Sequence, residues 1–106
     1  MKFLKLMADY ECFPTWEIFD DDLENIDPNK LKISDELKKE LEKWSTDYDL
    51  TLNQSDPINS GFADENHQDN FDKIGQKLFV MLKQQLGDGY SVEYCDSRGK
   101  KSGLIK

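Results

Sequence analysis

The chain has 106 residues, of which 37% are hydrophobic and 34% charged, and its formal net charge is -8. This length suits one modest hydrophobic core, so we expect residues 1–106 to fold as a single domain. No stretch approaches the roughly 18 to 20 apolar residues that cross a bilayer, and acids interrupt the N-terminal apolar run before a signal-peptide core forms. The composition therefore excludes a membrane-spanning protein, and we expect a cytoplasmic one.

The negative charge is concentrated in one segment. Residues 9–27 contain eight Asp or Glu and no Lys or Arg, whereas the remaining residues contain 14 acids and 14 bases. A local negative field repels nucleic acid and anionic lipid, whose phosphates need cationic partners, and it attracts a basic protein surface. The segment therefore predicts a cationic protein partner rather than nucleic acid or membrane.

The first half of the chain predicts a strand, a loop and a helix. Residues 2–8 are mostly apolar and favour a buried strand. Residues 9–30 show neither the helical nor the strand period, so we expect a long, irregular acidic loop. A helix is predicted over residues 34–48, because the Ser34 hydroxyl can cap its first turn and apolar residues recur at helical spacing. Those apolar positions are Leu37, Leu41, Trp44 and Tyr48.

The second half begins with a connection over residues 50–63, within which 50–53 favour a short strand. A second helix is predicted over 64–86, capped by Asp64 and ended by Gly87. Gly75 within it is expected to permit close packing. The expected buried stripe of this helix is Phe71, Ile74, Leu78, Met81, Leu82 and Leu86.

Alternating residues and a following turn predict a C-terminal strand or hairpin over residues 90–105. Together, the elements predict an α/β chain of the α+β type, with a small sheet of three to four strands and two helices packed on one face. Cys12 and Cys95 lie far apart and form no C-x-x-C pair, so neither a disulfide framework nor a zinc site is expected.

Residues suited to catalysis are scarce. Nucleophilic catalysis needs a base such as His beside Ser or Cys, and the sole histidine, His67, lies among polar residues where we expect it to be exposed. Asp20, Asp22 and Glu24 match the first ligand positions of a calcium-binding loop. Asn25 and Leu31, however, stand where such a loop requires Gly and Glu. We therefore expect no catalytic residues, no metal and no cofactor, and hence a protein that is not an enzyme.

Aromatic side chains are interleaved with the acids of residues 9–27. Large rings in a negative field suit a protein interface, although Trp16 itself is expected in the core. A nuclease cleft is one suitable basic partner, because carboxylates can occupy positions meant for phosphates. The predicted partner-binding residues are Glu17, Phe19, Asp20, Asp21, Asp22, Glu24 and Asp27.

A resemblance to a known family extends over most of the chain. It rests on residues 8–16, on Leu37, Leu41 and Trp44, on 48–53, 56–57 and 60–62, and on Gly75, Leu78 and 90–94. These residues resemble the immunity proteins of bacterial contact-dependent growth inhibition and related polymorphic toxin systems. They are features of the fold more than of a site.

The resemblance implies a cytoplasmic protein that binds and neutralises the C-terminal domain of one cognate toxin. We expect a monomer in a 1:1 complex with that domain. That domain would be a basic protein, a ribonuclease being one candidate, and the family supplies no catalytic residues. The alternative from charge alone is an acidic regulatory or scaffold protein that binds a basic housekeeping protein.

Overall fold

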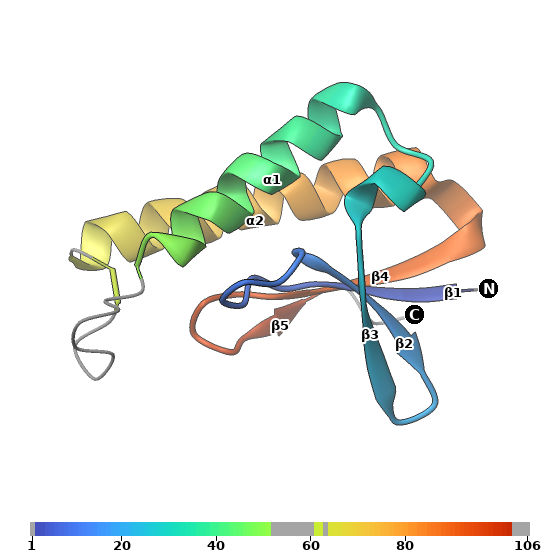
Figure 1. The fold of residues 1–106 in the computed structure, drawn as a ribbon, viewed down its shortest axis with the longest axis horizontal. Helices are drawn as coiled ribbons and strands as arrows, with labels where there is room; N and C mark the ends of the chain where they lie inside the picture. Colours follow the sequence, from blue (N-terminus) through green and yellow to red (C-terminus); the bar gives the residue numbers. More distant parts are fainter. Residues whose placement is uncertain (1, 52–60, 63, 103–106) are drawn as a thin grey trace.

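The computed structural model describes residues 2–51, 61–62 and 64–102. Within these ranges five strands form one mixed sheet, and two α-helices lie over one of its faces (Figure 1). The strand order is β3-β2-β1-β4-β5, in which β1 and β4 are parallel and the other pairs antiparallel. The predicted α+β class with two helices on one face is confirmed, but this sheet has one strand more than the expected three to four.

The strands are β1 (Lys2–Leu6), β2 (Thr15–Phe19), β3 (Asp22–Ile26), β4 (Tyr90–Cys95) and β5 (Lys101–Ser102). The helices are α1 (Asp35–Asp49) and α2 (Glu65–Leu86), and single 3-10 turns form η1 (Pro28–Lys30) and η3 (Gly87–Gly89). The short strand predicted over 50–53 is absent at Leu50 and Thr51, which form a turn after α1, and its other residues lie outside the described ranges. Residues 103–105 of the predicted C-terminal hairpin also lie outside them.

Both α-helices begin at the predicted caps. The Ser34 Oγ accepts a hydrogen bond from the backbone N–H of Leu37 at 3.1 Å, and the Asp64 carboxylate accepts one from that of His67 at 2.8 Å. These bonds satisfy N–H groups that the first helical turn leaves without intrahelical partners. Gly87 ends α2 with a φ of +66°, a conformation that its lack of a Cβ permits.

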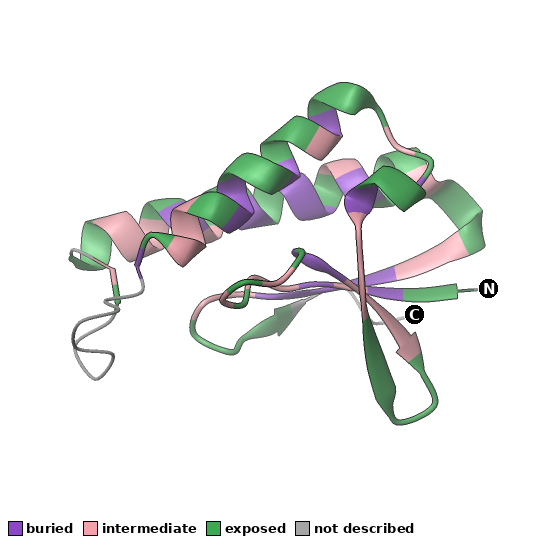
Figure 2. Cartoon of the chain, viewed as in Figure 1, coloured by how far each residue is buried: buried purple, intermediate pink, exposed green. Residues whose placement is uncertain are grey.

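The core lies between the sheet and the helices (Figure 2). Alternate strand residues point toward α1 and α2, so β1 and β4 each contribute every second side chain. The core cluster consists of Leu4, Leu6, Val92 and Tyr94 from the sheet, Leu31 from the segment before α1, and Leu37, Leu41, Trp44, Phe71, Leu78, Phe79 and Leu82 from the helices. Ile74 was predicted to be buried but is 47% exposed, because the buried stripe of α2 runs through Gly75 and Phe79 instead.

Gly75 permits close packing, as its sequence context predicted. A Cβ at this position would approach Trp44 Cζ2 to 2.8 Å and would overlap the Tyr94 hydroxyl. The hydroxyl lies here because it donates a hydrogen bond to the carbonyl of Asp72 at 3.2 Å, and the Trp44 indole N–H donates to that of Phe71 at 3.0 Å. The glycine therefore fixes how closely α2 approaches both α1 and the sheet.

The predicted irregular loop over residues 9–30 is wrong for most of its length. Thr15–Phe19 and Asp22–Ile26 form an antiparallel hairpin at the edge of the sheet, and Pro28–Lys30 form a 3-10 turn. Residues 15–18 and 22–24 do alternate between polar and apolar side chains, but each run is short and the acids Asp20 and Asp21 lie between them. The apolar residues of this alternation face away from the helices, because Glu17 pairs with core-facing Leu4 and Ile18 therefore points to the opposite side.

Candidate partner-binding surface

Six of the seven predicted partner-binding residues lie on the β2–β3 hairpin. A two-residue loop joins its strands, since Phe19 pairs with Asp22 and only Asp20 and Asp21 lie between them. Asp20 has a φ of +49°, a left-handed conformation that Asp tolerates better than most residues. In Figure 1 the hairpin turns away from the helix layer, and residues 19–24 are exposed.

The pairing register separates the hairpin into two faces. Glu17 pairs with Leu4 of β1 and with Glu24 of β3, so these side chains lie on the side of the sheet that carries the core. Phe19, which is 47% exposed, and its pair Asp22 share that side. We call Glu17, Phe19, Asp22 and Glu24 the acidic face of the hairpin.

Two carboxylates stand directly opposite each other on the acidic face. Glu17 and Glu24 are cross-strand partners, and like charges in such a pair are destabilising. Within the described ranges, no Lys or Arg nitrogen lies within 4.0 Å of either carboxylate. The hairpin therefore retains an uncompensated negative charge that weakens its own pairing.

The seventh predicted residue, Asp27, has a structural role that the sequence analysis missed. Its Oδ1 accepts hydrogen bonds from the backbone N–H of Asn29 at 2.9 Å and from the Asn29 Nδ2 at 3.1 Å. It thereby caps η1 and turns the chain from β3 toward α1. Asp27 is half-buried and lies apart from the acidic face.

The opposite side of the hairpin is apolar. Phe3, Ile18 and Leu23 are aligned in register across β1, β2 and β3, and Phe3 and Leu23 are each 45% exposed. Trp16 lies on this side too, half-buried, with its indole N–H donating to the carbonyl of Met7 at 3.0 Å. The prediction that Trp16 belongs to the core is wrong, because the strand period directs it away from the helices. We call Phe3, Ile18 and Leu23 the apolar row.

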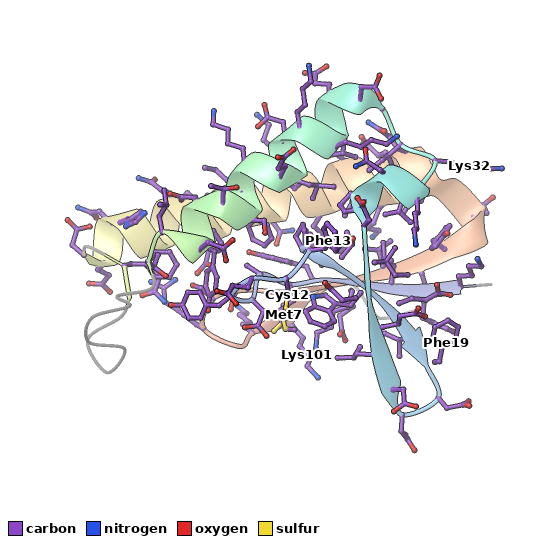
Figure 3. The ribbon with its side chains drawn as sticks, in the orientation of Figure 1. Met7, Cys12, Phe13, Phe19, Lys32 and Lys101 are labelled. Carbon is purple, nitrogen blue, oxygen red and sulfur yellow. The ribbon has the colours of Figure 1, made fainter. Side chains whose placement is uncertain are left out.

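Side-chain hydrogen bonds hold the loop before the hairpin. The Asn25 Oδ1 accepts from the backbone N–H of Phe13 at 2.9 Å, and its Nδ2 donates to the carbonyls of Phe13 at 2.7 Å and Thr15 at 3.2 Å. From α1, Ser45 Oγ donates to the carbonyl of Cys12 at 3.1 Å. The loop thus presents Phe13, which is 46% exposed, on a fixed backbone (Figure 3). No local sequence pattern marked Asn25 for this role.

The Cys12 thiol, in the loop before the hairpin, lies in a negatively charged environment. Burial, followed by the charges of Asp9, Asp49 and Glu11, raises the pKa of Cys12 above its ordinary value. Cys12 and Cys95 are both free. A raised pKa keeps the Cys12 thiol protonated and suppresses its reactivity as a nucleophile.

Other charged residues are engaged in contacts within the fold. Arg98, in the turn after β4, binds Asp72 at 2.5 Å and Asp69 at 2.7 Å and so attaches this turn to α2. His67 was predicted to be exposed but is half-buried, with its Nε2 3.7 Å from Asp47 and its ring edge-on to Phe62. In the described part of the chain, no group of three or more His, Cys, Asp or Glu residues could hold a metal ion.

Two grooves open beside α1, and neither includes residues 17–24. The larger, of about 850 Å³, runs between α1 and α2 over Trp44, Ile74 and Leu78. The smaller, of about 510 Å³, lies between α1, η1 and Phe13. Among the described residues, neither α-helix has an apolar stretch long enough to cross a membrane.

The fold and the hairpin define a small α+β protein with a two-sided, acidic and apolar surface at one edge of its sheet. The chain belongs to the family described as Serratia CdiI immunity protein-like, whose model matches residues 2–97. The family match confirms the resemblance to immunity proteins of contact-dependent growth inhibition, and it implies that the chain binds a cognate toxin protein. A comparison with curated proteins finds no match for the chain.

Proposed function

We propose that this immunity protein neutralises its cognate toxin domain by placing the acidic face of the β2–β3 hairpin on a basic cleft of that domain. A nuclease is the toxin activity that best suits such a surface, because a cleft that binds phosphates also binds carboxylates. The proposal names Glu17, Phe19, Asp20, Asp21, Asp22 and Glu24 as contact residues. The complex would contain one copy of each protein.

One observation carries the proposal: Glu17 and Glu24 are paired across the strands, and no Lys or Arg nitrogen of the described residues lies within 4.0 Å of either carboxylate. Such a pair weakens the free protein, and a cationic partner would offset that repulsion on binding. Residues 9–27 as a whole lack Lys and Arg, so the segment contains no base of its own to balance its eight acids. This field would also accelerate encounter with a basic toxin domain.

Binding measurements on a neutralised hairpin tip would test the proposal. In the variant Asp20→Asn/Asp21→Asn/Asp22→Asn the turn should persist, because Asn also tolerates the left-handed conformation of residue 20. The partner should be the C-terminal domain of the toxin encoded directly upstream of the immunity gene. We expect the association rate to fall by about tenfold or more at low salt, with a smaller salt dependence than for the wild-type protein.

A matched control separates a local contact from the effect of net charge. Glu40, Glu42 and Asp88 are exposed and lie outside the hairpin, and the described residues show no ion pair to any of them. The variant Glu40→Gln/Glu42→Gln/Asp88→Asn changes the net charge equally and should bind nearly as well as the wild type. If both triple variants weaken binding equally, or neither does, the hairpin is not the contact surface.

A further inference from the structure

We infer that the toxin domain contacts both faces of the β2–β3 hairpin, which enters a cleft in the toxin as a wedge. This inference rests on the proposed function and extends it from the acidic face to the apolar row. It predicts a cleft with cationic side chains on one wall and an apolar surface on the other. A single sheet layer is roughly 10 Å thick, so the cleft must be about that wide.

The apolar row is an ordered feature of the sheet rather than a set of scattered exposed residues. Phe3 pairs with Ile18 and Ile18 with Leu23, so the three side chains form one line across three strands. Neighbouring strands are about 4.8 Å apart, and the line is therefore roughly 10 Å long. Aligned apolar side chains that remain nearly half exposed at both ends mark an interaction surface more strongly than isolated ones do.

The charges around the apolar row indicate what covers it. The turn acids Asp20 and Asp21 adjoin the row. On β1, Lys5 lies on the same face as the row, but its Nζ is 3.9 Å from the Glu93 carboxylate and forms an ion pair with it. Lys101 shares this face but lies on β5, at the opposite edge of the sheet. An apolar row bordered by unpaired acids fits an apolar patch bordered by Lys or Arg.

A second copy of this chain fits the apolar row poorly. A two-fold dimer through this face would bring two hairpin tips close together, and the described part of the chain shows no ion pair to the carboxylates of either tip. Each chain also has a formal net charge of -8, so the copies repel each other at long range. The toxin domain, with the opposite charge, meets no such barrier.

The two faces should contribute to binding in different ways. Apolar contacts form after encounter and act mainly on the dissociation rate, whereas charges at the rim act mainly on the association rate and its salt dependence. Contact on both faces therefore predicts two separable kinetic effects from substitutions only one residue apart. The neighbours Leu23 and Glu24 point to opposite sides of β3 and provide this comparison.

The test compares Leu23→Thr with Glu24→Gln in surface plasmon resonance against the upstream-encoded toxin domain. Leu23→Thr should raise the Kd about tenfold or more through faster dissociation, with the salt dependence unchanged. Glu24→Gln should slow association and reduce the salt dependence. Val80→Thr on α2, where Val80 is 43% exposed, serves as the apolar control and should leave the Kd within about twofold of the wild type.

The outcomes separate this inference from the proposed function. If Leu23→Thr binds like the wild type while Glu24→Gln is impaired, the acidic face binds alone and the wedge is wrong. If Glu24→Gln has no effect, the proposed function fails first, whatever Leu23→Thr does. Size measurement of the free protein supplies a further check: a wild-type dimer that Leu23→Thr converts to a monomer would place a second copy on the apolar row and overturn the inference.

Discussion

Replacing Glu24 by Lys should stabilise the free protein while weakening toxin binding. Glu24 is exposed and lies directly across from Glu17, so the substitution exchanges a repulsive cross-strand pair for an attractive one. Such pairs are worth roughly 0.2–1 kcal/mol, and removing repulsion while adding attraction should raise the free energy of unfolding by about 1 kcal/mol at low salt. The same change places a positive charge where the proposal puts a basic cleft.

Urea denaturation at two salt concentrations would measure the stability effect. The Debye length is about 30 Å at 0.01 M and 3 Å at 1 M salt, so most of the gain should disappear at 1 M. The double variant Glu17→Lys/Glu24→Lys restores a like-charge pair with the sign reversed. It should be less stable than Glu24→Lys alone, although its net negative charge is smaller.

The double variant also distinguishes the effect of the residue 17–24 cross-strand pair on stability from the effect of a smaller net charge. If stability rises steadily with each added Lys, the gain comes from the smaller net charge, and the cross-strand repulsion inferred here is refuted. If Glu24→Lys stabilises the protein but leaves toxin affinity unchanged, the cross-strand repulsion between Glu17 and Glu24 is supported and the proposed toxin contact at Glu24 is refuted. Isothermal titration with the toxin domain supplies the binding measurement.

Three further predictions concern the fold. Gly75→Ala should destabilise the protein by roughly 1–3 kcal/mol in urea unfolding, because the new Cβ overlaps Tyr94 and approaches Trp44; a more stable variant would contradict this packing. Asn25→Ala should speed amide hydrogen exchange at Phe13, because it removes the acceptor of that N–H, and unchanged protection would show that the loop is held by other contacts. Burial, and then nearby negative charge, raises the pKa of Tyr94 above its usual 10.0. The folded state therefore holds the phenolic proton more tightly than the unfolded state, and the free energy of unfolding should fall as the pH rises above about 10. Tyr94→Phe should reduce that slope between pH 9 and 11, and an unchanged slope would assign the loss to other groups.

Sequence alone predicted both helices, because their signals are local. Ser34 and Asp64 cap helices within three residues of themselves, and the apolar spacing that follows needs no distant partner. Gly75 was likewise recognised as a packing position, because a glycine inside a helix weakens that helix and close packing is a reason to keep it. The acidic character of residues 9–27 is also a property of the sequence, and it identified the segment that carries six of the proposed contacts.

Tertiary structure decided how that segment is arranged. Glu17 faces Glu24 because the chain turns at Asp20 and Asp21, and no Gly or Asn marked that two-residue turn in the sequence. Phe3 aligns with Ile18 through the pairing of β1 with β2, which no local pattern reveals. The hairpin alternates polar and apolar residues only over the short runs 15–18 and 22–24, and both sides of its outer part meet solvent. Composition thus determined that this protein carries a concentrated negative charge, whereas folding decided that Glu17, Asp22 and Glu24 share one side of a hairpin and that an apolar row occupies the other.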